Sequence, residues 1–285
     1  MRGMFVTGPP SSVDGTSLRV CGAASRTFDD LTGQVLNPTM RGYVHDMAVP
    51  YGLAVREDLI DRGVGHSYGE MCTPLLDELV PEDRPADLLV LATAIPDVRY
   101  GRSTATYLGW HCAGTPLAFT VCDQGLLAAF TALHLVAAYT RTGTCLRAVL
   151  LVAEQPTLYH ELPVPTPIPD RAAAVGVVVE ADGSRGGLSV RRHTKIAERD
   201  VPEVLASHLP GSGTAIVGTG LAEVLADRPV DGNVLVCQEN QPLTGIWSEL
   251  SQRLSGWQGS GEQVVLADFD PALGYLFSAT LSFGG

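Results

Sequence analysis

The sequence is 285 residues long and 45% hydrophobic, which is enough for one large domain or two fused halves around a sizeable core. Its formal net charge of −12 argues against a nucleic-acid partner, because affinity for the phosphate backbone depends largely on clustered Lys and Arg. It contains no run of about 18 uncharged apolar residues, and residues 1–10 lack the long apolar stretch of a secretory signal. We therefore expect a cytoplasmic protein without a membrane partner.

The cysteines are scattered, with no C-x-x-C pair and no histidine cluster beside them. We expect no metal site and no cofactor, and reduced thiols in a cytoplasmic chain. Buried cysteines usually act as small hydrophobic residues, and we interpret most of these in that way. Only Cys122 stands in a context that suggests chemistry. The six positions are Cys21, Cys72, Cys112, Cys122, Cys145 and Cys237.

The elements in chain order alternate between helices and strands after residues 1–66, which are rich in Gly, Pro and Ser and predict irregular structure. Alternation of this kind indicates βαβ units and a parallel sheet, hence an α/β fold. Helical spacing occurs at Tyr68–Leu79, Ser103–Trp110, Leu126–Tyr139, Val201–Leu209 and Leu243–Leu254. Strand patterns occur at Leu88–Thr93, Leu117–Val121, Ala148–Ala153, Ala172–Glu180, Leu188–Thr194, Thr214–Val217, Asn233–Val236, Val264–Ala267 and, as a closing antiparallel strand, Tyr275–Phe283.

A proline-rich connector divides the pattern. Pro163, Pro165, Pro167 and Pro169 exclude regular helix and central strand, because proline lacks a backbone N–H and fixes φ. The predicted division is an N-terminal half, residues 1–170, and a C-terminal half, residues 171–285.

Several segments, in this order and spacing, resemble the thiolase superfamily in the form of β-ketoacyl-acyl-carrier-protein synthase III. Ala86–Asp97 is similar to the family's strand and turn D-x-x-x-x-A-T-x-x-P-D, and Ala118–Val121 to the strand that leads to the nucleophile. Arg147–Glu154 and Gly261–Asp270 resemble later strands. Over residues 68–283 the resemblance implies a thiolase-like fold, in which two related βαβ-containing halves form a layered α-β-α-β-α arrangement.

The chemistry of that family requires a cysteine at the N-terminus of a buried helix, where the helix dipole stabilises the thiolate. Alignment through Phe119–Val121 without a gap places Gly125 or Leu126 at this position, and Cys122 falls about three residues too early. A local deletion would bring Asp123 or Gln124 there, and neither forms a thioester. An unusual loop is the only way for Cys122 to serve as the nucleophile.

The position of the family's catalytic histidine holds another residue in this sequence, whereas the position of its asparagine is matched. The stretch that matches the histidine turn is Ala215–Gly220, with Gly218 in place of histidine. Asn240 matches the family's asparagine in position, although an asparagine there also suits a helix N-cap. The remaining histidines that we considered are interpreted as structural: His111 after a helix, His134 facing out of an apolar helix, His193 on an edge strand and His208 in a helix.

The loss of two catalytic groups from an intact scaffold suggests a subunit without its own chemistry. The resemblance extends to the non-catalytic subunits of heterodimeric alkylquinolone condensing enzymes, which carry a turn like Phe269-Asp270-Pro271. It implies an active homologous partner, or self-pairing as a relic, with Cys122–Leu127 and Ser103–Trp110 at the interface. The alternative is an autonomous acyltransferase that uses Cys122, with acyl-CoA or acyl carrier protein as donor.

Overall fold

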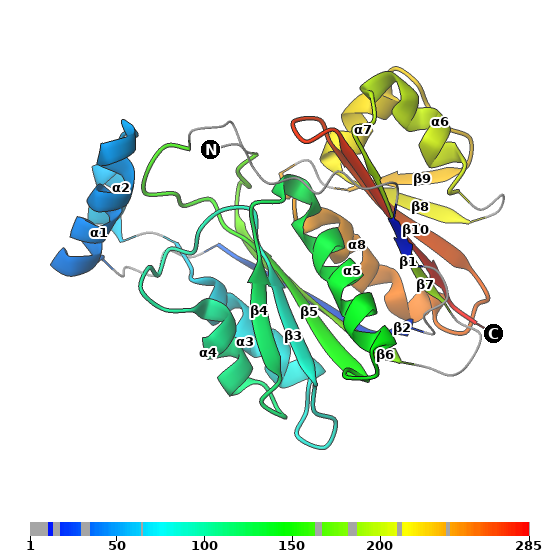
Figure 1. Cartoon of the computed structure of the whole chain (residues 1–285), viewed down its shortest axis with the longest axis horizontal. Coiled ribbons are helices and arrows are strands. Elements are labelled where there is room, and N and C mark those ends of the chain that lie inside the picture. Colours follow the sequence, from blue (N-terminus) through cyan, green and yellow to red (C-terminus); the bar gives the residue numbers. More distant parts are fainter. Residues whose placement is uncertain are drawn as a thin grey trace.

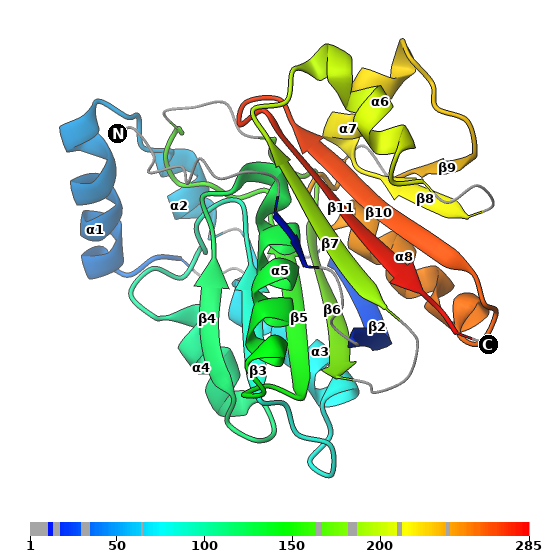
Figure 2. The same ribbon diagram turned by 45° about the vertical axis from the view of Figure 1, so that its right-hand side comes forward.

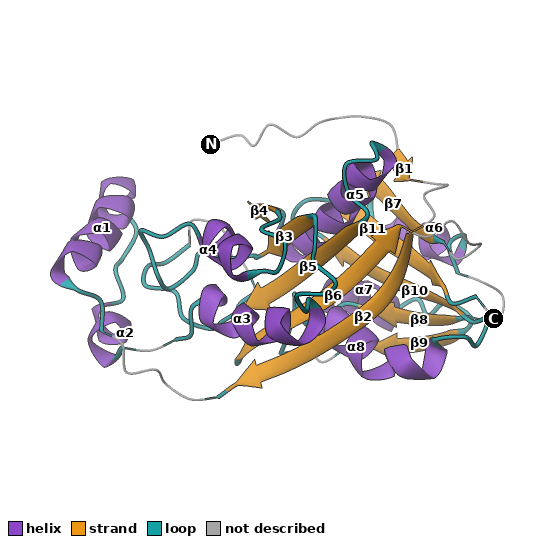
Figure 3. Cartoon of the chain, turned by 90° about the horizontal axis from the view of Figure 1, so that it is seen from below, coloured by secondary structure: helices purple, strands orange, loops and turns teal. Residues whose placement is uncertain are grey.

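Figure 1 presents the computed structural model of the chain, which describes residues 11–13, 18–29, 35–63, 65–162, 167–181, 187–209, 213–237 and 240–284. Two sheets enclose a middle layer of helices, α5 (Ala128–Arg141) and α8 (Gly245–Trp257). Further helices cover the two outer faces (Figure 3), so the layers follow the predicted α-β-α-β-α order. The outer helices are α3 (Tyr68–Leu79) and α4 (Thr104–His111) on the first sheet, and α6 (Val201–Ala206) and α7 (Thr219–Ala226) on the second.

The first sheet has the strand order β2-β6-β5-β3-β4. The three strands at one side are parallel, whereas β6 and β2 are antiparallel to their neighbours. β4 pairs only with β3 within the described residues, so it leaves one edge of this sheet open. The strands are β2 (Leu18–Phe28), β3 (Leu88–Ala92), β4 (Leu117–Val121), β5 (Arg147–Glu154) and β6 (Ala172–Ala181).

The second sheet has the order β1-β7-β11-β10-β8-β9. β10, β8 and β9 are parallel, and β11 runs antiparallel between β10 and β7, as its sequence predicts. Both sheets are thus mixed rather than wholly parallel. The strands are β1 (Ser11–Val13), β7 (Leu188–Thr194), β8 (Thr214–Val217), β9 (Asn233–Val236), β10 (Gln263–Asp270) and β11 (Tyr275–Ser282).

The central strands are apolar throughout because they are covered on both faces. In β3, Val90 faces the layer that holds α5, whereas Leu89 and Leu91 face α3 and α4. Side chains of a strand alternate between the two faces, so a strand between two helical layers needs apolar residues at every position. This is why the short apolar runs predicted the strands well.

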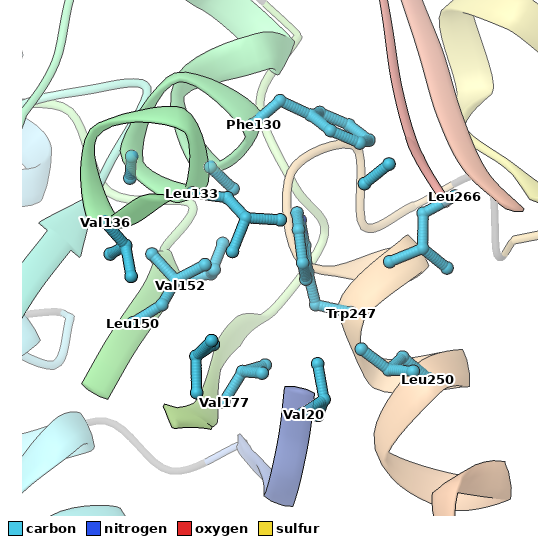
Figure 4. Packing of buried hydrophobic residues seen from close by; sticks show 14 of the residues in the cluster. Val20, Phe130, Leu133, Val136, Leu150, Val152, Val177, Trp247, Leu250 and Leu266 are labelled. Carbon is cyan, nitrogen blue, oxygen red and sulfur yellow. The ribbon is translucent and has the colours of Figure 1, made fainter. Parts of the chain in front are cut away.

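The main core lies between the sheets (Figure 4), where α5 and α8 meet. Phe130 of α5 packs against Trp247 of α8, with ring centroids 5.3 Å apart, and against Phe277 of β11 at 6.1 Å. All three side chains are no more than 2% exposed. Figure 2 shows α5 running along the first sheet beneath β7 and β11, so these aromatic contacts connect the middle layer with the second sheet.

The structure differs from the element predictions in two places. The described part of residues 1–66 contains regular structure, since β2 spans eleven residues, and α1 (Pro38–Ala48) and α2 (Glu57–Arg62) follow it. α7 was not predicted, because its first turn contains Gly220. The division at residue 170 stays a prediction; in the structure β6 belongs to the first sheet and β7 to the second.

Parts of the proline-rich connector, including Pro163 and Pro165, lie outside the described residues. Among the helices of the described ranges, none is long and apolar enough to cross a membrane.

Candidate functional site

The junction between β4 and α5 is the place where the synthase-like alignment expects a nucleophile. β4 ends at Val121, and after a short loop a 3₁₀ turn, η2 (Gly125–Leu127), leads directly into α5. Gly125 begins this turn with φ +54°, a left-handed conformation that glycine adopts without strain. The residue at the start of the buried helix therefore has no side chain for covalent chemistry.

Asp270, the last residue of β10, fills the space that a side chain at Gly125 would need. A Cβ atom added to Gly125 would overlap Oδ2 of Asp270. The same oxygen accepts a hydrogen bond from the backbone N–H of Leu126 at 3.3 Å, and Oδ1 accepts one from Leu273 at 3.1 Å. A carboxylate that is only 6% exposed thus occupies the helix N-terminus, where a bound anion would otherwise be stabilised.

Cys122 lies in the exposed loop before this turn. Its Sγ atom is 3.7 Å from Oδ2 of Asp123, which itself has a left-handed backbone with φ +58°. Partial burial, and next the negative charge of Asp123, raise the pKa of the Cys122 thiol. A reactive cysteine needs the opposite environment, one that lowers the thiol pKa. The neighbouring Gln124 side chain donates a hydrogen bond to the carbonyl of Asp123.

Gly218, the position that the sequence alignment matches to the family's histidine, lies between β8 and α7 as the N-cap of that helix. A Cβ atom at Gly218 would overlap the carboxyl group of Asp268 on β10. Two residues further on, a Cβ atom at Gly220 would overlap the carbonyl oxygen of Phe269. Both glycines are therefore required by the close approach of β10, and a histidine at residue 218 has no room.

Asp268 is fully buried and caps α7. Its Oδ1 accepts hydrogen bonds from the backbone N–H groups of Leu221 at 3.0 Å and Phe269 at 2.9 Å. Oδ2 has no hydrogen-bond partner in the part of the chain that the structure describes. Burial raises the pKa of Asp268 to about 7, and burial followed by the charge of Asp268 raises the pKa of Cys237 to about 12. Cys237 is thus an inert, protonated thiol.

Glu154, the last residue of β5, provides a third carboxyl group at a helix N-terminus. It accepts hydrogen bonds from the backbone N–H groups of Leu243 (2.9 Å) and Thr244 (3.0 Å), and from the Thr244 hydroxyl. Thr244 is the N-cap of α8 and has no side-chain cap of its own. Burial raises the pKa of Glu154 to about 7, against the lowering effect of these donors.

Asn240 does not cap α8, contrary to one of its two interpretations. It is exposed and lies four residues before the N-cap Thr244, and its backbone carbonyl accepts a hydrogen bond from the N–H of Asp170 at 3.1 Å. The structure therefore places an exposed Asn240 in the turn before α8, while the capping is performed by Glu154.

The histidines occupy places that differ in part from the sequence interpretation. His208 lies in the turn after α6 rather than in a helix, and His193 is on β7, which lies between β1 and β11 rather than at an edge. His134 is half-buried on α5 and His111 ends α4. Among the described residues, no group of three or more His, Cys, Asp or Glu side chains is arranged to hold a metal ion.

The five layers, the two mixed sheets and the paired strand–helix junctions define a thiolase-like fold. Solved structures of condensing enzymes match the chain over nearly its whole length. The tetronic acid condensing enzyme AbyA1 is 16% identical with a TM-score of 0.63, covering 94% of this chain and 100% of its own. No protein-family model matches the sequence, and no curated protein is significantly similar to it.

Two further structures give a similar result. The 3-oxoacyl-(acyl-carrier protein) synthase of Burkholderia xenovorans is 15% identical with a TM-score of 0.61, covering 98% of this chain and 97% of its own. Synthase III, FabH, of Pseudomonas aeruginosa is 18% identical with a TM-score of 0.61, covering 94% and 99%. The chain thus has the fold of synthase III-type condensing enzymes, as its sequence segments predicted.

Sequence reasoning missed the three carboxyl groups as a set. Glu154 and Asp270 each end an apolar strand, and Asp268 lies two residues before the end of β10; this signal was visible in the sequence. A charged residue that closes a buried strand needs a partner, and a helix N-terminus nearby is a natural one.

We expect a strong energetic coupling between Gly125 and Asp270. Gly125→Ala should lower the free energy of unfolding by at least about 2 kcal/mol, because a left-handed alanine and an overlap with the carboxylate add together. In an Asp270→Ala background the same substitution should cost about 1 kcal/mol, the backbone penalty alone. Denaturant unfolding of the four proteins measures the coupling. Gly143→Ala is a matched control, since Gly143 has φ +73° and open space at its Cβ. If Gly125→Ala cost the same in the parent and in the Asp270→Ala protein, the overlap would be contradicted.

We also expect Asp268 to make stability depend on pH. The pKa of Asp268 is about 7 in the folded chain and near 3.8 when the residue is exposed. The folded state therefore binds the proton more tightly than the unfolded state does. Stability is highest at low pH and falls as the pH rises through about 7. Asp268→Asn removes this dependence. The variant should gain on the order of 3 kcal/mol relative to the parent between about pH 4 and pH 8. Urea unfolding across this range tests the effect, and the exposed Asp227→Asn, a change of the same charge, should leave the parent's profile unaltered.

Proposed function

We propose that this chain is a synthase III-like subunit without condensing chemistry of its own, which acts as the partner of an active homologue. The observation that carries the proposal is the pair Gly125 and Asp270. Gly125, before the buried helix, has no nucleophilic side chain. The carboxylate of Asp270 accepts the hydrogen bond of the Leu126 N–H group, which would otherwise stabilise a reacting anion.

The electrostatics at the other junctions support the same function. Acyl transfer through a thioester develops negative charge, which a catalytic site stabilises with donors and cations. Here Asp268, Asp270 and Glu154 present carboxyl groups to three helix N-termini. An oxyanion or a thiolate at these places would meet like charges, or would displace groups that the fold needs as helix caps.

The open edge of the first sheet supports a protein partner. On β4, Leu117 is 55% exposed, and Trp110 at the end of α4 is 78% exposed. Phe119 is partly buried and packs against Tyr139, with ring centroids 6.0 Å apart. An edge strand with exposed apolar side chains favours pairing with another chain.

The surface proposed for the partner is therefore β4 with Trp110. The loop Cys122–Gln124 adjoins it. Leu126 and Leu127, which the sequence interpretation also assigned to the interface, are 6% and 1% exposed, so they belong to the core instead. An acyl-CoA or acyl carrier protein would then be bound by the active homologue. In this respect the proposed role is that of the non-catalytic subunits of alkylquinolone condensing enzymes.

The substitution Leu117→Asp should abolish formation of the heterodimer. The measurement is native mass spectrometry after co-expression with a synthase III-like homologue that carries the cysteine, histidine and asparagine. The control is Val236→Asp on β9, the edge strand of the second sheet, where Val236 is 56% exposed; it should leave the complex intact. Absence of a one-to-one complex with the parent chain, or equal loss with both variants, contradicts the proposed surface.

The alternative, an autonomous acyltransferase, rests on the exposure of Cys122, which leaves the thiol accessible. We expect no acyl adduct when the purified chain is incubated with acetyl-CoA and longer acyl-CoA esters, because the pKa of Cys122 is raised. Intact-mass spectrometry, with Cys122→Ala as control, gives the answer. A stoichiometric adduct that Cys122→Ala abolishes would establish the acyltransferase and overturn the silent-subunit proposal.

A further inference from the structure

The outer face of the second sheet carries a strip of polar side chains where β7 and β11 pair. Leu188 and Val190 of β7 point into the core between the sheets, so the alternating residue Arg191 points outward. The same alternation on β11 turns Ser278 and Thr280 outward, and the register places Ser278 directly opposite Arg191. This strip lies far from the junction at Gly125 in sequence and belongs to a different face of the fold.

A cavity of about 370 Å³ lies over this strip, beside the turn that follows α6. Its polar lining consists of one cation, one imidazole, one amide and hydroxyl groups, and no acidic side chain lines it within the described ranges. A chain with a net charge of −12 makes such a lining unusual. Among the side chains that carry these groups are Arg191, His208, Ser189, Ser207, Thr280 and Ser282.

Arg191 is the cation of this cavity. Its side chain makes no hydrogen bond and no ion pair with any residue that the structure describes. In contrast, Arg147 in the first sheet is paired with Glu180, and Arg41 with Glu57 and Asp61. An arginine that faces hydroxyl groups without a carboxylate retains all five of its donors for a ligand.

His208 lines the cavity, and His193 contacts His208. The pKa values of both depend on the charges around the cavity. His193 Nε2 lies 3.1 Å from His208 Nε2, and His208 Nδ1 lies 2.9 Å from the hydroxyl of Ser278. Burial is the main reason why the pKa of His208 falls to about 4, and His193 and Arg191 lower it further. Burial, followed by the charge of Arg191, also lowers the pKa of His193. No acidic group contributes to either shift. The surroundings therefore oppose an added cation and favour an anion.

We propose that this cavity binds a small oxyanion of the phosphate class, as free phosphate or as a phosphate monoester. The planar guanidinium of Arg191 matches two oxygens of such an anion, and bidentate arginine–phosphate pairs are among the stronger hydrogen-bonded interactions. The Thr280 hydroxyl, which makes no side-chain hydrogen bond to a described residue, and the Ser282 hydroxyl, which accepts from Gln263 at 3.5 Å, supply further donors. This binding is independent of the partner proposed above.

Isothermal titration of the full chain with inorganic phosphate, at constant ionic strength with chloride as the reference anion, tests the site. We expect saturable binding of phosphate beyond that of chloride. Arg191→Gln should weaken it at least about 10-fold, and Thr280→Val about 3-fold, because a charged donor contributes more than a neutral one. Arg191→Lys, which keeps the charge and loses the fork, should retain an intermediate affinity.

Arg228→Gln is the matched control, since Arg228 is exposed and, among the described residues, its side chain donates only to the carbonyl of Arg199. It should bind phosphate like the parent. Thermal unfolding of each variant establishes that it is folded. A parallel titration with glycerol phosphate distinguishes the two sources: tighter binding than phosphate indicates a phosphorylated metabolite, and weaker binding indicates the free ion. Binding no stronger than that of chloride, or unchanged in a folded Arg191→Gln protein, overturns the proposal.

Discussion

The structure depends on one repeated interaction, a carboxyl group at the end of a strand that caps the N-terminus of a helix from another part of the chain. Glu154 caps α8, Asp268 caps α7 and Asp270 caps the turn before α5. Each helix begins with free N–H groups and a partial positive charge, and each has no side-chain cap of its own. The caps connect both sheets to the helices between and outside them, so the layers are held in register by buried polar contacts as well as by apolar packing.

These contacts are the basis of the proposal that the chain has no condensing chemistry of its own. A condensing enzyme leaves its helix N-termini free for charge that develops during reaction. In this chain the same positions hold permanent carboxyl groups, and the glycines at residues 125 and 218 are what allows those groups to approach. A cysteine at residue 125 or a histidine at residue 218 would therefore conflict with the packing of β10.

Much of the fold was predictable from the sequence. Strands buried on both faces, such as β3 and β8, have continuous apolar runs, and the bounds predicted for β4, β7, β8 and β9 agree with the structure. α3 was predicted equally well, since Met71, Leu75, Leu76 and Leu79 form an apolar stripe at helical spacing. β2 and α7 were missed because glycines interrupt their patterns. The place of Gly125 at the start of the turn before α5 followed from the strand–helix pattern. The contact between Glu154 and Thr244 joins residues 90 positions apart, and such pairs have no local signal.

The two N-terminal strands have a consequence for the order in which the chain can fold. β1 joins the second sheet beside β7, and β2 joins the first sheet beside β6. A segment of fewer than twenty residues therefore supplies a strand to each sheet. Their partners are synthesised more than 140 residues later. Such pairings demand the closure of very long loops, which slows folding. During translation β1 and β2 therefore remain unpaired until β6 and β7 have been synthesised. The pairing of these strands then joins the two sheets.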